Sequence, residues 1–150
     1  MKLEEEINQT KNFSSEFHKL AVNIIYTHGW LMQIHSEAFK GYGITVQQYN
    51  ILRILRGQNP DPVTVNELKE RMLDKMSDVS RLVERLRVKE LVERKICPDD
   101  RRRAEVTITK KGLDLLGDLD SREEIITASL SSISENEAKK VNDLLDKMRG

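Results

Sequence analysis

The segment KMSDVSRLVERLRVKELVERKICPDDRRRAEVTITKKG, residues 75–112, decides the fold that we expect for this chain. Its first half carries apolar residues at intervals of three and four, the period of one face of an α-helix. This apolar stripe consists of Val79, Leu82, Val83 and Leu86. The polar residues that point away from the stripe or flank it are Ser77, Ser80, Arg81, Glu84 and Arg85. A helix that docks one face on a core and presents hydroxyls and arginines near its N-terminus fits the DNA major groove.

The second half of this segment predicts a β-hairpin with a charged tip. Residues 91–97 are rich in Leu, Val and Ile, and residues 104–109 alternate between apolar and polar side chains. The connecting turn, residues 98–103, ends in three adjacent arginines. Arginines at a protruding tip suit a phosphate backbone or a narrow minor groove, whose negative potential attracts them.

The distribution of charge supports a localised basic surface. The chain has 150 residues, enough for one ordinary domain or a small domain with an appended one, and a formal net charge of zero. Residues 81–111 contain 11 Lys and Arg against 6 Asp and Glu, whereas residues 113–150 contain 5 against 9. The zero sum argues against general nucleic-acid affinity, but positive charge gathers on the helix and hairpin.

Other sequence features exclude several classes of protein. The single cysteine, Cys97, excludes an internal disulfide, and we expect it to be a small buried hydrophobe rather than a redox switch. His18, His28 and His35 lie on one predicted helix without further metal ligands, so we expect structural roles and no metal. No signal core or membrane-length apolar run is present, so we expect a soluble, cytoplasmic protein. We find no phosphate loop or activated nucleophile, and we expect neither an enzyme nor a cofactor.

Five further helices are predicted from periodicity and capping signals. An apolar stripe beginning at Phe17 predicts a long helix over residues 17–39. Residues 45–48 and 64–67 are capping boxes that open two shorter helices, the first with Tyr49, Leu52 and Leu55 directed inward. Thr109 caps another long helix, and residues 134–137 form a third capping box before the last one. Residues 1–12 are expected to fray or to extend the next helix.

This order of elements predicts a mainly α fold with a small β-hairpin wing. Helix, turn, amphipathic helix and hairpin over residues 41–112 form a winged helix-turn-helix. The flanking helices, residues 1–40 and 113–150, have apolar stripes and no sheet to cover. We therefore expect them to form a dimerisation region.

The motifs, taken in order, resemble the MarR family of bacterial transcription regulators. The resemblance rests on residues 43–49 with Leu52, residues 64–68, residues 77–83, and residues 100–102 with 108–112. It implies a homodimer on a palindromic operator of double-stranded DNA, with one helix of each subunit in a major groove and its wing over the adjacent minor groove. The residues expected at the DNA are Thr64, Lys75, Ser77, Asp78, Ser80, Arg81, Arg85, Asp100, Arg101, Arg102 and Arg103. Asp100 is expected to pair with Arg102 and hold it extended.

Two positions depart from the family pattern. Glu90 stands where the family usually has glycine after its DNA-reading helix, which predicts a different local turn. The first helix lacks the cysteine of the family's peroxide sensors, so a thiol sensor of that kind is not supported.

A small-molecule effector is implied by resemblance only. The resemblance implies that this chain binds aromatic acids, as members of the family do. The candidates to line a pocket between the dimer helices and the DNA-binding unit are Tyr26, Trp30 and Tyr49. Core packing is the alternative role for these aromatic residues. The sequence thus predicts a DNA-binding regulator, with a winged-helix protein-interaction module, whose basic wing meets an acidic partner, as the alternative.

Overall fold

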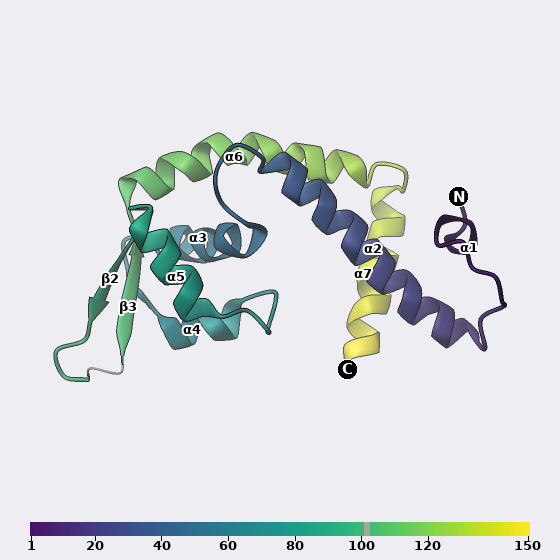
Figure 1. Ribbon diagram of the computed structural model, residues 1–150, viewed down its shortest axis with the longest axis horizontal. Coiled ribbons are helices and arrows are strands. Elements are labelled where there is room, and N and C mark those ends of the chain that lie inside the picture. The colour runs from purple at the N-terminus through teal and green to yellow at the C-terminus, as the bar shows by residue number, and fades with distance from the viewer. Residues whose placement is uncertain (101–102) are drawn as a thin grey trace.

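The computed structural model describes residues 1–100 and 103–150 and confirms the mainly helical fold with a small sheet. A winged-helix lobe, residues 39–119, lies at one end, and a helical arm, residues 1–38 and 120–150, extends from it to both termini (Figure 1). In chain order the elements are α1 (Leu3–Glu6), α2 (Glu16–Ala38), α3 (Val46–Gln58), β1 (Val63–Thr64), α4 (Val65–Arg71), α5 (Val79–Val88), β2 (Val92–Ile96), β3 (Ala104–Ile108), α6 (Lys110–Ser129) and α7 (Glu135–Arg149).

Local capping signals set the starts of most helices, as the sequence predicts. Complete capping boxes, in which the cap side chain and the side chain three residues later exchange bonds with backbone N–H groups, open α3, α4 and α7. The Thr109 hydroxyl accepts from the backbone N–H of Gly112 and caps α6. Residues 1–12 differ from expectation: α1 folds back, with Leu3 buried and Glu4 paired with Lys19.

The sheet has three antiparallel strands in the order β1-β3-β2. The hairpin is confirmed, with Val92 opposite Ile108 and Ile96 opposite Ala104. Strand β1 has only two residues, too few for an alternation pattern, and was not predicted. Because Val63 of β1 pairs with Val106 of β3, this strand ties the start of α4 to the wing.

The end of α5 retains a left-handed turn despite the missing glycine. Glu90 has a φ of 61°, so the expected departure at this position does not occur. The Leu91 N–H donates to the Leu86 carbonyl at 3.0 Å, and the Glu90 N–H donates to the Arg87 carbonyl at 2.9 Å. These two bonds and the buried side chains of Leu86 and Leu91 form a Schellman motif, which stabilises the turn against the steric cost of a non-glycine residue.

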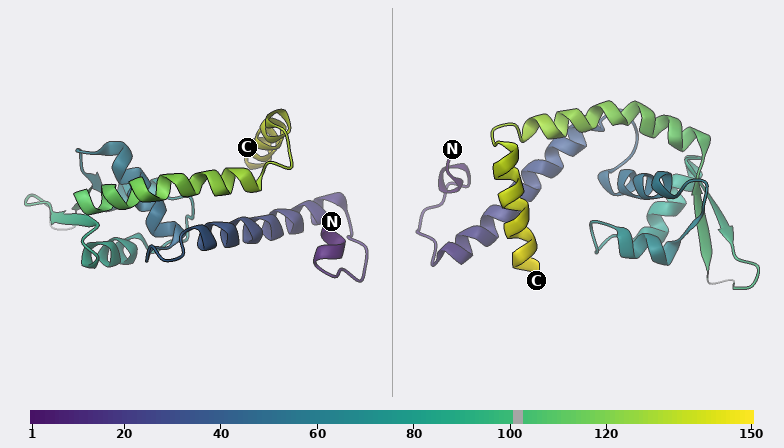
Figure 2. Two further views of the ribbon diagram at one scale, coloured as in Figure 1. Left: turned by 90° about the horizontal axis from the view of Figure 1, so that it is seen from above. Right: turned by 180° about the vertical axis from the view of Figure 1, so that it is seen from behind.

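The hydrophobic core lies in the winged-helix lobe and ends along α6. Leu116 and Leu119 are fully buried, but α6 has no buried residue after Leu119, and α7 has none at all. In the arm, α2 and α6 run side by side (Figure 2, left). The arm therefore leaves large apolar side chains exposed, among them Phe17, Ile24, Ile25, Val141, Leu144 and Met148. Within the described residues, no helix is long and apolar enough to span a membrane.

Candidate nucleic-acid interface

Helix α5 separates an apolar face from a polar face, as its sequence predicts. Val79, Val83 and Leu86 are buried in the core of the lobe, with Leu82 partly buried against it. On the other side, Ser80, Arg81 and Arg85 are exposed. The helix lies next to the hairpin (Figure 1). Ser80 of its polar side lines the same cavity as Arg94 and Arg103 of the wing, so these side chains belong to one surface.

The N-terminus of α5 differs in detail from the prediction. The helix begins at Val79, so Ser77 precedes it and does not belong to its polar face. Asp78 is the N-cap, and its Oδ1 accepts from the backbone N–H of Arg81 at 3.2 Å. The Ser77 hydroxyl oxygen is buried without a hydrogen-bond partner among the described residues. A DNA contact by Ser77 therefore requires its side chain to rotate outward.

The arginines around α5 divide into paired and unpaired groups. Arg87 holds Glu84 through two bonds, from Nε at 2.9 Å and from Nη2 at 2.7 Å, and Arg94 lies 3.8 Å from the same carboxylate. The bonds from Arg87 lower the pKa of Glu84 below its ordinary value. In contrast, the part of the chain that the structure describes offers Arg81 and Arg85 no ion pair. These two guanidinium groups are available to an external anion or base.

The wing places Arg103 at the same cavity as Ser80 of α5. The Arg103 N–H donates to the Asp100 carbonyl at 2.9 Å, and the Cys97 N–H donates to the Arg103 carbonyl at 2.8 Å. Arg101, Arg102 and the expected Asp100–Arg102 pair lie outside the described residues. Cys97 is partly exposed rather than fully buried, because it lies where the hairpin leaves the core.

A polar cavity of about 460 Å³ lies between α4, α5 and the wing. Of the residues expected at the DNA, it brings together Thr64, Ser80, Asp100 and Arg103. It also adds three that sequence reasoning missed, namely Asn66, Lys69 and Arg94. No local pattern marks these three, because tertiary packing alone brings α4 and β2 to the polar face of α5. The cluster gives the cavity several groups that can bind phosphate oxygens.

Two expected contacts are already engaged within the chain. The Thr64 hydroxyl accepts from the Glu67 N–H at 3.2 Å, and the Glu67 carboxylate accepts from the Thr64 N–H at 2.7 Å. These bonds, with Arg103 nearby, lower the pKa of Glu67. The Lys75 ammonium donates to the Glu70 carbonyl. The Thr64 side chain also bonds to the Glu67 carboxylate, so both Thr64 and Lys75 must exchange a partner to reach DNA.

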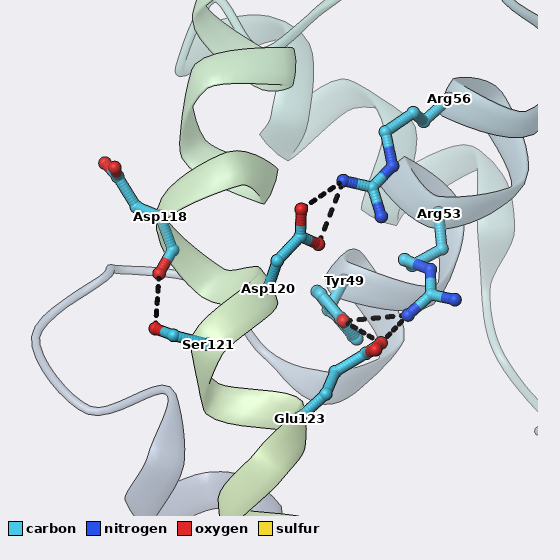
Figure 3. A network of polar contacts seen from close by, with 7 residues as sticks. All are labelled: Tyr49, Arg53, Arg56, Asp118, Asp120, Ser121 and Glu123. Carbon is cyan, nitrogen blue, oxygen red and sulfur yellow. Dashed lines mark hydrogen bonds and ion pairs between the residues drawn. The ribbon is translucent and has the colours of Figure 1, made fainter.

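The three candidate ligand-binding aromatic residues have different surroundings. Tyr49 is buried, and its hydroxyl donates to Glu123 at 2.7 Å (Figure 3). Its ring packs on Phe39, with the ring centroids 4.5 Å apart. Tyr26 and Trp30 are 38% and 41% exposed on α2. Tyr49 thus has the core-packing role within this chain, and a ligand pocket that includes Tyr26 and Trp30 stays a prediction.

Comparisons with known proteins agree with this geometry. Residues 42–103 match the sequence model of the MarR family. The HTH-type transcriptional regulator MgrA of Staphylococcus aureus is 29% identical over 113 residues, which are 75% of this chain and 75% of MgrA. The structure of the S. aureus MepR–DNA complex matches with a TM-score of 0.71 and 24% identity, covering 91% of this chain and 97% of MepR. Bordetella bronchiseptica BpsR, solved to explain regulation of its DNA binding by 6-hydroxynicotinic acid, matches with a TM-score of 0.79 and 22% identity, covering 88% of this chain and 99% of BpsR.

Proposed function

Because this chain belongs to the MarR family of winged-helix transcription regulators, we propose that it is a repressor that binds a palindromic operator as a homodimer. Members of this family regulate transcription and are not enzymes. The observation that carries the proposal is the exposed pair Arg81 and Arg85 on α5, for which the described residues provide no ion pair. Arg81 lies near the N-terminus of this amphipathic helix and Arg85 in its last turn, and a helix with exposed guanidinium groups suits direct reading of the major groove.

The proposed DNA contacts are made by α5 and by the wing. Helix α5, the recognition helix, enters the major groove, where Arg81 and Arg85 bind guanine edges or phosphates. The wing arginines, residues 101–103, enter the adjacent minor groove, where negative potential is strong. The residues of the cavity between them, including Lys69 and Arg94, bind the intervening phosphates and set the register.

The exposed apolar side chains of the helical arm support a homodimer. A groove of about 830 Å³ between α2 and α7 is lined mainly by aliphatic residues, including Leu20, Ile24, Val141, Leu144 and Met148. A soluble protein rarely exposes such a contiguous apolar surface, and a second copy of the chain can cover it by two-fold symmetry. A dimer of this kind places its two recognition helices on half-sites about 10 base pairs apart.

The proposal includes release from DNA by a small aromatic or phenolic ligand. BpsR, which shares the fold, has its DNA binding regulated by such a molecule, 6-hydroxynicotinic acid. In this chain, Tyr26 and Trp30 are partly exposed on α2, where a ligand could stack against them. A ligand bound at the arm changes DNA affinity only if it binds one arrangement of the two lobes more tightly than the other.

The experiment that tests the proposal is footprinting on the DNA upstream of the protein's own gene. Excess nonspecific competitor and two salt concentrations separate specific from electrostatic binding. We expect a protected palindrome that survives the competitor and lies over promoter elements. Binding that the competitor erases on this DNA and on a genomic library would refute the proposal and favour a winged-helix protein-interaction module.

A further inference from the structure

A network of polar contacts joins α3 to α6 where the lobe meets the arm (Figure 3). The Tyr49 hydroxyl donates to Glu123 Oε1 at 2.7 Å and accepts from Arg53 Nη1 at 3.0 Å. Arg53 also forms an ion pair with Glu123. These three residues close a triangle in which each group bonds to the other two.

A second contact between the same two helices lies one turn further along, and we call the two sets of contacts the ties. Arg56 Nη1 donates to both carboxylate oxygens of Asp120, at 3.0 and 3.1 Å. Positions 49, 53 and 56 share one face of α3, and positions 120 and 123 share one face of α6. Because the partner number on α6 falls as the number on α3 rises, the two faces run antiparallel, over about two turns of α3 and about one turn of α6.

These ties lie where α6 leaves the core. Leu119 is the last buried residue of α6, and Asp120 and Glu123 follow it directly. Beyond them, α6 continues into the arm and connects to α7, which has no buried residue. The ties are therefore placed where a bend between lobe and arm would occur.

The chemistry of the ties suits orientation more than overall stability. The Arg53 and Glu123 side chains are 42% and 43% exposed, and ion pairs at such positions contribute little to folding. Apolar contacts, in contrast, are non-directional and allow α3 to rotate or slide along α6. Hydrogen bonds to carboxylates have fixed distances and angles and so select one rotation. Since α3 packs on α5, this rotation also fixes the recognition helix.

We propose that Tyr49, Arg53 and Arg56 with Asp120 and Glu123 are positioning residues that set the half-site spacing read by the dimer. This inference rests on the proposed function. Half-sites about 34 Å apart place each recognition helix about 17 Å from the two-fold axis. A rotation of about 10° at that radius moves the helix about 3 Å, close to the ~3.4 Å rise per base pair. Removing these contacts should therefore allow the dimer to bind half-site spacings that differ by about one base pair.

The first test uses the variant Asp120→Asn with Glu123→Gln, which removes the charges and keeps the side-chain shapes. The matched control is Asp114→Asn with Asp118→Asn on the same helix, which gives the same charge change. Among the described residues Asp114 pairs with Lys110 of its own helix, and the Asp118 carboxylate points away from α3 (Figure 3). Both variants and the parent are titrated on operators whose half-site spacing is changed by one or two base pairs, and on a single half-site.

We expect the parent and the control to prefer their best spacing by at least about 10-fold. The Asp120→Asn, Glu123→Gln variant should prefer it less than about 3-fold, while its affinity for the single half-site stays within about 2-fold. A merely structural role predicts instead that affinity for every DNA falls together with the melting temperature. A spacing profile identical to that of the parent overturns the proposal.

A second measurement decides the orienting role without DNA. Spin labels at Gln33→Cys on α2 and Glu70→Cys on α4, in a Cys97→Ser background, report the distance between arm and lobe within one chain diluted with unlabelled protein. We expect a narrow distance distribution in the parent and a broad one in the Asp120→Asn, Glu123→Gln variant. A separate variant that exchanges the two charges, Arg56→Asp with Asp120→Arg, should again give a narrow distribution. An unchanged width in the variant overturns the inference. If the parent prefers no DNA, the proposed function fails, while this measurement still decides the role of the ties.

Discussion

Replacing Arg81 by alanine should remove a DNA contact without disturbing the fold. The described residues give the Arg81 guanidinium no ion pair, and the side chain is exposed, so the variant should unfold within about 0.5 kcal/mol of the parent. A bidentate contact between arginine and guanine contributes about 1–3 kcal/mol. This corresponds to a loss of about 5- to 150-fold in operator affinity.

The control is Arg87→Ala, the same substitution six residues later on the same helix. Arg87 already bonds to Glu84 through two nitrogens, at 2.9 and 2.7 Å, and has no free donor face comparable to that of Arg81. We expect Arg87→Ala to change operator affinity less than about 3-fold. Competition binding at several salt concentrations measures both effects.

The salt dependence identifies the kind of contact. If Arg81 binds a phosphate, the slope of log affinity against log salt should become shallower by about 0.9, and affinity for all sequences should fall alike. If Arg81 reads a base, the slope should change little and preference at one operator position should relax. Equal losses from Arg81→Ala and Arg87→Ala, or no loss from either, would refute the division into free and paired arginines.

Three further predictions concern stability. Glu90→Gly should raise unfolding free energy by about 1 kcal/mol and the melting temperature by about 2–4 °C, because Glu90 adopts a φ of 61°; an unchanged or lower melting temperature would contradict this. Gly112→Ala should lower it by about 1–3 kcal/mol in denaturant titration, because the new Cβ would meet the Leu91 carbonyl and lie 2.7 Å from Ile108 Cγ1. His35, whose pKa burial lowers, binds a proton more readily when unfolded, so it destabilises the fold below about pH 6.5. When the pH is lowered from about 7.5 to 5.5, the melting temperature of His35→Gln should therefore fall less than that of the parent.

The elements that could be predicted from sequence are those with local signals. Thr45 with Gln48 and Thr64 with Glu67 form reciprocal bonds over three residues, and both helix starts were placed correctly. The amphipathic stripe of α5 is equally local, and its burial is confirmed. The start of α5 differs from the prediction, because Ser77 was assigned to the polar face of the helix and the folded chain has Asp78 as the N-cap.

The features that could not be predicted depend on contacts between distant residues. Tyr49 and Glu123 are 74 residues apart, and no spacing rule connects them. The same holds for the cavity that brings Lys69 and Arg94 to the polar face of α5. Within α5 the spacing is local but ambiguous, because Glu84 is three residues from both Arg81 and Arg87, and only the structure shows that it pairs with Arg87.

The zero net charge of the chain is compatible with a basic interface because many acidic side chains are used internally. Glu84, Asp120 and Glu123 pair with arginines of the same chain, and the carboxylates of Glu67 and Asp78 accept from backbone N–H groups at helix starts. Glu84 offsets the charge of its own partner Arg87, and carboxylates that lie more than a Debye length from α5 add little repulsion there. The potential at α5 and the wing is therefore set by the cations left without such partners. On this argument, the position of each carboxylate relative to the arginines, more than the sum of charges, determines where this protein meets DNA.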